Sequence, residues 1–377
     1  MPRETFGEQE QQENKLPERL ETAGKVFEGF VGLKETEKVL FVTDNKPFDT
    51  DPEFIGVLKK YLEQKNIEFS EIVCDENTQP VEFNELIKQY DFIWNSWDMN
   101  DTEIDWDELV ESIKEKGNRM AFCPGVKVES LNGDGALAED KNALEQRLNR
   151  MEERLRGVSG FNIKTWYGTD LRIQMKTDER RWFKDSGVIS PGSWDNLPGG
   201  EVFTTPDEGK VEGVLMLPVL QDEVTQNQGV DEFVKLTIKN GKIVTIDGGK
   251  SAEKLRQYLE ENSKEEDNPY SVLQCAEIAF GANSKARSVV SKPEGDYTDT
   301  TNSTVETEKR LGTMHIAFGS SKHGEEGTEG HNESDVHLDF VIPRHGLTVT
   351  GFNRYDDFQK NKNGQRLIDE GRWNFLE

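Results

Sequence analysis

The stretch Lys38-Val-Leu-Phe-Val-Thr-Asp44 decides the fold of the first part of the chain. It is a short, continuous apolar run rich in β-branched residues, which is typical of a strand buried in a parallel sheet. Helical and strand patterns alternate after it, which predicts βαβ units. We therefore expect a Rossmann-like N-terminal α/β domain over residues 17–138. Its further elements are expected as helices at 51–64, 81–90 and 106–116 and strands at 68–74, 91–94 and 119–122.

Two segments flank this domain. Residues 1–16 are rich in Glu and Gln and are predicted to be disordered. Residues 139–160 are expected to contain a connecting helix, because four apolar side chains recur at spacings that place them on one helical face. Such a stripe packs in a core or forms a seam between subunits, so it permits a homodimer. Its members are Leu144, Leu148, Met151 and Leu155.

The pattern of apolar and polar residues changes after the connecting helix. Alternating apolar and polar residues recur from about residue 166 onward, and residues 233–246 contain two such runs joined by Asn240-Gly241. An Asn-Gly pair between alternating runs is a strong signal for a β-hairpin. Residues 161–377 are therefore expected to form an antiparallel-sheet α+β C-terminal catalytic domain.

Composition limits the partners and the compartment. The 377 residues include 73 Asp+Glu against 46 Lys+Arg, a net charge of −27. A surface this negative repels nucleic-acid phosphates and anionic membranes, so we expect neither as a partner; it suits a salt-adapted host or simply an acidic cytosolic protein. The three cysteines form no C-x-x-C pair, and the first residues lack an apolar signal segment. Both features favour a cytoplasmic protein without thiolate zinc sites.

Histidines are confined to one short region. All five lie within residues 315–345, although histidine is the side chain best suited to metal binding and proton transfer near neutral pH. A solvated loop would account for His323 and His331, because residues 319–335 are rich in Gly, Ser and Glu. It does not account for His315 and His337, which lie within apolar strand patterns.

Three expected strands each offer metal-ligand side chains. In Val336-His-Leu-Asp-Phe-Val-Ile342, residues two apart share a face, so His337 and Asp339 point the same way. His315 stands opposite the apolar side chains of its own strand, and Glu277 repeats this arrangement. A lone strand Glu is more often a solvated residue. An imidazole and a carboxylate on one face nevertheless form a metal half-site.

Four motifs resemble the aminopeptidase T family of metal-dependent aminopeptidases. The run Asn196-Leu-Pro-Gly-Gly-Glu-Val-Phe-Thr-Thr-Pro206 is similar to the first, and residues 276–281, 311–319 and 337–340 match the others in the family's order. The resemblance implies a site holding two divalent ions, zinc, cobalt or manganese. The ligands that it implies are Glu201, Glu277, His315, His337 and Asp339, with Glu277 as the bridging residue.

The same resemblance implies an activity. It predicts an aminopeptidase, a hydrolase that removes N-terminal residues from peptide substrates with a water activated by two metal ions. Glu308 matches a further family glutamate and would act as general base. It could equally be a solvated residue in the charged run 306–310.

One departure from the family keeps other functions open. Members carry a metal-site tyrosine seven residues after the first histidine, where this chain has Lys322 followed by His323. Either the tyrosine is dispensable here, or His323 takes its place, or the site is adapted to another reaction. His315, His337 and Asp339 alone form a 2-His-1-carboxylate set, the arrangement of mononuclear non-haem Fe(II) oxygenases. Dihydroxypyridine ring-cleaving dioxygenases, which resemble the aminopeptidase T fold, use such a set. A non-catalytic acidic binding protein is the third alternative.

Overall fold

The chain divides into two compact units. The computed structural model describes residues 6–46, 49–99, 102–176, 180–218, 224, 233–287, 290–291, 297–298, 304–322 and 330–376. Unit 1 comprises Met1–Ala143, Asp185–Gly199 and Asn283–Arg287, and unit 2 comprises Leu144–Lys184, Gly200–Ala282 and Ser288–Glu377. No pattern in the sequence indicated that two later segments return to unit 1.

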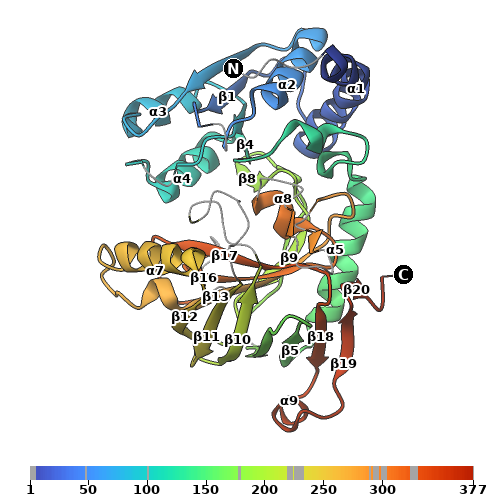
Figure 1. The fold of residues 1–377 in the computed structure, drawn as a ribbon. Coiled ribbons are helices and arrows are strands. Elements are labelled where there is room, and N and C mark those ends of the chain that lie inside the picture. Colours follow the sequence, from blue (N-terminus) through green and yellow to red (C-terminus); the bar gives the residue numbers. More distant parts are fainter. Residues whose placement is uncertain are drawn as a thin grey trace. The chain divides into compact units, whose positions relative to one another are not determined.

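Unit 1 is built on a five-stranded parallel sheet in the order β2-β1-β3-β4-β8 (Figure 1). Every side chain of β1 is buried, as expected for a strand covered on both faces. The elements are α1 (Phe6–Lys25), the π-helical turn η1 (Val26–Val31), β1 (Val39–Thr43), α2 (Pro52–Lys65), β2 (Phe69–Val73), α3 (Pro80–Ile87), β3 (Phe92–Asn95), α4 (Trp106–Lys116), β4 (Arg119–Phe122), η2 (Val128–Leu131), η3 (Ala136–Ala138) and β8 (Ser193–Asn196).

Side-chain caps explain where two of these helices begin. Asp51 accepts hydrogen bonds from the backbone N–H groups of Glu53 and Phe54 at the start of α2, and Asp105 accepts one from Glu108 at the start of α4. Such caps satisfy N–H groups that have no partner within the helix. The predicted Rossmann-like alternation is therefore encoded locally.

Two predictions from the sequence differ from the structure of unit 1. The helix α1 begins at Phe6, inside the segment 1–16 predicted to be disordered, and residues 1–5 lie outside the described residues. Glu, Gln and Lys are good helix formers, so a polar composition does not exclude a helix. The fifth strand, β8, was not expected, because Ser193-Trp-Asp-Asn196 is short and polar and has no apolar run.

The connecting helix is α5 (Lys141–Leu155). Asp140 accepts a hydrogen bond from the N–H of Ala143 at its start. The apolar stripe Leu144, Leu148, Met151 and Leu155 is at most 1% exposed within the single chain. The stripe therefore belongs to the core, and it is not an exposed seam for a second subunit.

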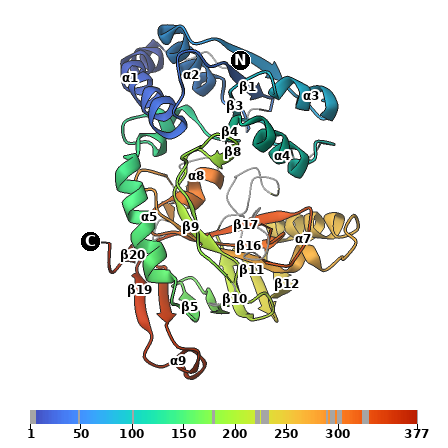
Figure 2. The same cartoon turned by 180° about the vertical axis from the view of Figure 1, so that it is seen from behind.

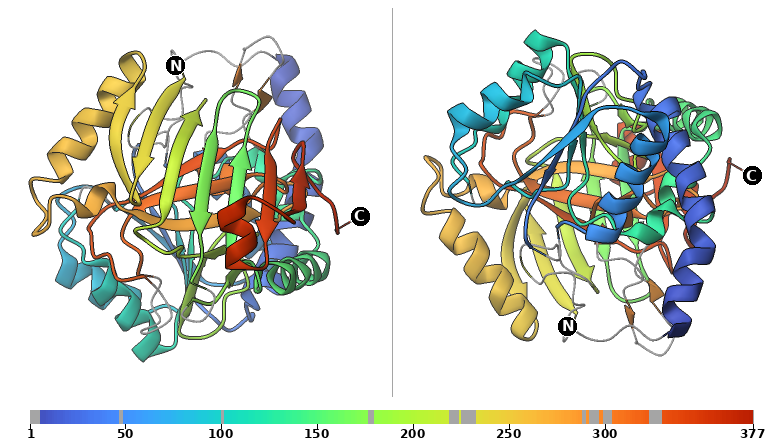
Figure 3. Two further views of the ribbon diagram at one scale, coloured as in Figure 1. Left: turned by 90° about the horizontal axis from the view of Figure 1, so that it is seen from below. Right: turned by 90° about the horizontal axis from the view of Figure 1, so that it is seen from above.

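Unit 2 contains an eight-stranded antiparallel sheet in the order β12-β11-β10-β6-β5-β18-β19-β20. Asn240 and Gly241 have φ of 50° and 75°, as a two-residue hairpin turn requires. In Figure 3 the strands lie side by side, with α7 packed on β11 and β12. The elements are β5 (Gly160–Lys164), β6 (Asp170–Gln174), β10 (Val211–Leu217), β11 (Val234–Lys239), β12 (Lys242–Asp247), α7 (Lys250–Asn262), β18 (Thr348–Phe352), α9 (Tyr355–Lys360), β19 (Gln365–Asp369) and β20 (Arg372–Trp373).

A second sheet of unit 2, here called the site sheet, has the order β17-β16-β13-β9-β7. The first four of these strands pair antiparallel (Figure 2). Its strands are β7 (Phe183–Asp185), β9 (Glu201–Thr204), β13 (Cys275–Gly281), β16 (Met314–Gly319) and β17 (His337–Ile342). The short helices η4 (Ser271–Leu273) and α8 (Thr304–Lys309) precede β13 and β16 in the chain. Between β13 and α8 in the sequence, β14 (Val290–Ser291) and β15 (Tyr297–Thr298) form a separate two-stranded sheet.

The two sheet types confirm the predicted fold class, a Rossmann-like parallel sheet plus an antiparallel α+β part. Among the described residues, none of the helices combines the length and the apolar character needed to cross a membrane. The domain limits 17–138, 139–160 and 161–377 remain a proposal. All predicted metal ligands lie in unit 2.

Candidate metal centre

One face of the site sheet carries all five predicted metal ligands. Residues directly opposite one another in an antiparallel pair project to the same face. Glu277 pairs with Ala317, which pairs with Asp339, and Gly281 pairs with Glu201. His315 lies two residues before Ala317 in β16, and His337 lies two residues before Asp339 in β17, so both histidines share the face. The other face is apolar and buried; it carries Ile278, Phe280, Ile316, Phe318, Leu338 and Phe340.

Small residues separate the ligand side chains on this face. Ala279 lies directly opposite His315, Ala317 lies opposite both Glu277 and Asp339, and Gly319 lies opposite His337. Larger side chains at these positions would fill the space above the sheet. The alternation of ligand and small residues therefore keeps the ligand side chains from being crowded by their neighbours on the adjacent strands.

His315 is at the middle of the cluster and is 1% exposed. Its Nε2 lies 3.1 Å from Glu277 Oε1, 3.5 Å from Glu201 Oε2 and 3.7 Å from Asp339 Oδ1. Its Nδ1 is buried without a hydrogen-bond partner among the described residues. Nε2 is therefore the nitrogen that an ion would meet.

His337 faces the same cluster from the edge strand β17. Its Nδ1 lies 2.8 Å from the carbonyl oxygen of Ser320, and its Nε2 lies 3.5 Å from Asp339 Oδ1 and 3.8 Å from Glu277 Oε2. A backbone carbonyl that accepts from one ring nitrogen fixes the tautomer and leaves the other nitrogen for a metal. Its side chain is 34% exposed, which gives the cluster a solvent-facing side.

The helix α8 adds two charged residues that are buried. Glu308 is 6% and Lys309 is 1% exposed, so the alternative of a solvated Glu308 is wrong. Lys309 Nζ lies 2.6 Å from Glu201 Oε1 and 2.8 Å from Glu308 Oε1. Lys309 could not be predicted from the sequence, because nothing in the charged run around it distinguishes it from a solvated lysine.

Glu201 reaches the cluster through a tight glycine turn. A Cβ on Gly199 would lie 2.2 Å from the backbone nitrogen of Gly187, and Gly200 has a φ of 135°. Neither position tolerates a side chain without displacement of the backbone. The pair Gly199-Gly200 thereby sets where β9 begins and where Glu201 projects.

The protonation states show that the cluster attracts cations. Burial opposes a charged imidazole, yet Asp339 and Glu201 raise the pKa of His315 to about 10. Burial also opposes the charge of His337, and Asp339 raises its pKa to about 10. Burial alone would raise the pKa of Asp339, but His337 and His315 hold it well below its usual range. Burial raises the pKa of Glu308 to about 8, against the lowering effect of Lys309.

The donor set fits a divalent ion. Three groups have ligand atoms within 4.8 Å of one another: Glu201, Glu277 and His315; Glu277, His337 and Asp339; and Glu308, His315 and Asp339. Carboxylate and imidazole donors without thiolate suit zinc, manganese, cobalt or iron. The structure thus brings together every residue of the predicted ligand set.

The remaining candidates lie away from the cluster. Lys322, at the position of the expected tyrosine, is exposed, and its Nζ lies 3.3 Å from Glu333 Oε1. His345 is exposed and contacts the edge of Trp166. The prediction for His323 falls outside the described residues.

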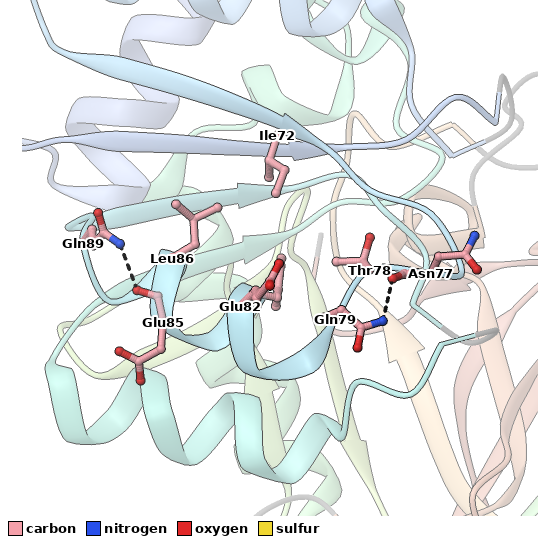
Figure 4. Close-up of a pocket in the computed structure, with 9 residues that line it drawn as sticks. Ile72, Asn77, Thr78, Gln79, Glu82, Glu85, Leu86 and Gln89 are labelled. Carbon is pink, nitrogen blue, oxygen red and sulfur yellow. Dashed lines mark hydrogen bonds between the residues drawn. The ribbon is translucent and has the colours of Figure 1, made fainter.

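A hollow of about 550 Å³ lies on unit 1 beside β2 and α3 (Figure 4). Its side-chain amides are held locally: Gln79 donates to the carbonyl of Asn77, and Gln89 donates to that of Glu85. No histidine or cysteine is among its lining residues, so it offers no comparable chemistry. It is lined by Ile72, Asn77, Thr78, Gln79, Glu82, Phe83, Glu85, Leu86 and Gln89.

A comparison with protein families bears on the activities considered above. The family model for 2,5-dihydroxypyridine 5,6-dioxygenase (NicX) matches residues 74–351, which include all five ligand candidates. The chain belongs to this family. The predicted fold similarity to aminopeptidase T also holds, but the family name describes a ring-cleaving dioxygenase.

One sequence relative carries the family's name, and two solved structures share the fold. A 2,5-dihydroxypyridine 5,6-dioxygenase of Pseudomonas putida KT2440 is 41% identical over 69 residues, 18% of this chain. The matched segment covers only 20% of that protein's length. The solved 2,5-dihydroxypyridine dioxygenase from the same bacterium has a TM-score of 0.65 at 16% identity, covering 95% of this chain and 97% of that one. Aminopeptidase T from Thermus thermophilus has a TM-score of 0.66 at 18% identity, covering 95% and 99%.

The aminopeptidase prediction is therefore corrected. Both the family model and the sequence relative carry the name of a dioxygenase, an oxidoreductase, and not of a hydrolase. The motifs led to the wrong activity because they describe the scaffold and the ligands, which a hydrolase and a dioxygenase can share. They do not specify how many ions bind or which metal.

Proposed function

We propose that this chain is a ring-cleaving dioxygenase that acts on 2,5-dihydroxypyridine or a closely related dihydroxylated pyridine. The match of the family model to residues 74–351 carries the proposal. Under this proposal the centre holds a single Fe(II), and not the two ions of zinc, cobalt or manganese that the sequence predicted. The proposed iron ligands are His315, His337 and Asp339.

Asp339 links the other two proposed ligands. Asp339 Oδ1 lies 3.7 Å from His315 Nε2 and 3.5 Å from His337 Nε2, so one carboxylate oxygen faces both imidazoles. Two histidines and one carboxylate are the ligand set of non-haem Fe(II) oxygenases, and they leave positions open for substrate and O₂. Glu277, 3.1 Å from His315 Nε2, would add a fourth donor.

Iron bound here would supply the redox chemistry that inserts both atoms of O₂ at the bond between ring carbons 5 and 6. The carbon–carbon bond breaks and each of the two carbons gains one oxygen atom, so no external reductant is consumed. Glu308 would exchange a proton with a substrate hydroxyl, because burial raises its pKa to about 8, near the working pH. The apolar face of the site sheet would hold this arrangement rigid.

The test combines metal content with oxygen consumption. Protein purified without oxygen and loaded with Fe(II) should bind one iron per chain and consume one O₂ per 2,5-dihydroxypyridine. His337→Ala should lose iron and at least about 100-fold in rate, since it removes a direct ligand. His345→Ala, an exposed histidine outside the cluster, should retain both. Absence of oxygen uptake with every dihydroxypyridine tried, despite bound iron, would refute the proposal.

A further inference from the structure

The buried lysine of the metal centre was not predicted from the sequence. Lys309 is 1% exposed, and its Nζ lies 2.6 Å from Glu201 Oε1 and 2.8 Å from Glu308 Oε1. A buried charge is tolerated only where opposite charges and hydrogen bonds compensate it. Here the compensating groups are two carboxylates that belong to the candidate metal groups.

The ammonium group occupies the position of a bridging cation. A metal ion that joined Glu201 and Glu308 would lie roughly 2.0–2.2 Å from one oxygen of each. Lys309 Nζ already lies between the same oxygens, Glu201 Oε1 and Glu308 Oε1. Two cations cannot share that point, because they would repel each other at short range in a medium of low dielectric constant.

The lysine affects the three ligand groups unequally. The group of Glu201, Glu277 and His315 contains one carboxylate that holds Lys309, and the group of Glu308, His315 and Asp339 contains the other. The group of Glu277, His337 and Asp339 contains neither. The position of Glu277, His337 and Asp339 therefore keeps all its donors, and His315 Nε2 lies beside it, 3.7 Å from Asp339 Oδ1. Each of the other two positions includes a carboxylate whose charge Lys309 already compensates; in Glu201 the lysine contacts Oε1, while Oε2 lies 3.5 Å from His315 Nε2.

We infer that Lys309 is a built-in cation that takes the place of a second metal ion and limits the centre to one divalent ion. The inference rests on the proposed metal centre and deepens it. Lys309 is a positioning residue: it holds Glu201 and Glu308 and does not need to touch the substrate. Its charge sets the number of ions, and with it the class of chemistry that the scaffold can perform.

The experiment counts Mn²⁺ ions in the full chain under anaerobic conditions. Wild type should bind one Mn²⁺ per chain, with the electron paramagnetic resonance spectrum of an isolated ion even in excess metal. Lys309→Met removes the charge at similar size, so it should bind two and show the spectrum of an exchange-coupled pair. Lys309→Arg keeps the charge, so this variant should bind one Mn²⁺ per chain, as wild type does. The control Lys164→Met removes a lysine from an exposed pair with Asp170 and should leave one ion.

Further variants separate the possible results. Glu201→Gln combined with Lys309→Met removes a carboxylate together with the lysine, and this pair should bind one ion again. Lys309→Gln, which keeps a polar group near both carboxylates, serves if Lys309→Met does not fold, and it too should bind two. The inference about Lys309 would be overturned if wild type bound two ions. It would also be overturned if Lys309→Met and Lys309→Gln each bound one ion with unchanged affinity. Neither result would affect the proposed iron centre. Failure of wild type to bind any ion would overturn the proposed iron centre as well.

Discussion

The pH dependence of metal binding follows from the protons on the two imidazoles. Without metal, the surrounding carboxylates raise the pKa of His315 and of His337 from 6.5 to about 10. A metal ion binds only the deprotonated imidazole, so each bound ion must displace these protons. We therefore expect the affinity for Mn²⁺ to increase as the pH rises between about 6.5 and 9.

The magnitude depends on how many protons are displaced. Displacing one proton lowers the dissociation constant about tenfold per pH unit, a free energy of about 1.4 kcal/mol. His315, 1% exposed, should contribute this in full. His337 should contribute less, because its side chain is 34% exposed and solvent screens its charges. The expected gain between pH 7 and pH 8 therefore lies between about tenfold and 100-fold.

The stability of the metal-free protein should change in the opposite direction. A group whose pKa is raised on folding stabilises the folded state fully below its unfolded pKa, and this contribution is lost as the pH rises through the folded pKa. For His315 the loss runs from about 6.5 to about 10. Glu308, whose pKa burial raises to about 8, changes in the same direction. The melting temperature of the metal-free protein should therefore fall while the stabilisation by Mn²⁺ grows.

Isothermal titration and thermal unfolding at several pH values, at one ionic strength, would measure both effects. A gain of about 1 kcal/mol corresponds to about 2–4 °C in melting temperature for a unit of this size. His345→Ala should keep the full dependence, since this exposed side chain lies outside the cluster. An affinity that stays constant or weakens from pH 7 to pH 8 would show that the imidazoles are not the ligands.

Two further predictions concern the scaffold. Gly199→Ala should destabilise the protein by about 1–3 kcal/mol, since the added Cβ would lie 2.2 Å from the nitrogen of Gly187; chemical denaturation checks this, and unchanged stability would mean that the turn before Glu201 yields easily. Leu148→Ala on α5 should cost about 2–5 kcal/mol, because the side chain is 1% exposed; a cost near zero would contradict its place in the core.

Much of the candidate site could be predicted from single strands. Alternation places His337 and Asp339 on one face of β17, and the same rule separates His315 from the apolar residues of β16. These are local consequences of a strand's period of two residues. The order of strands and helices in unit 1 was equally readable, because each element carries its own apolar pattern and caps.

Other features depend on residues far apart in the chain. Glu201 meets Glu277 only because β9 pairs with β13, and neither strand encodes its neighbour. The polar strand β8 joins the parallel sheet beside β4, although its own sequence has no strand signal. Pairing partners are chosen by the packing of the whole fold, which a local pattern does not contain.

The sequence by itself determined the two kinds of sheet, the candidate ligands of β13, β16 and β17 and the face on which each one projects, because these depend on periodicity and residue chemistry within a few positions. Only the tertiary structure decided that Lys309 is buried between Glu201 and Glu308. A lysine in a charged run is ordinarily solvated, and it becomes a fixed cation only where folding removes water and brings carboxylates from distant segments to it. Motifs alone do not contain such long-range contacts, so they indicated the scaffold and the candidate ligands but not the reaction.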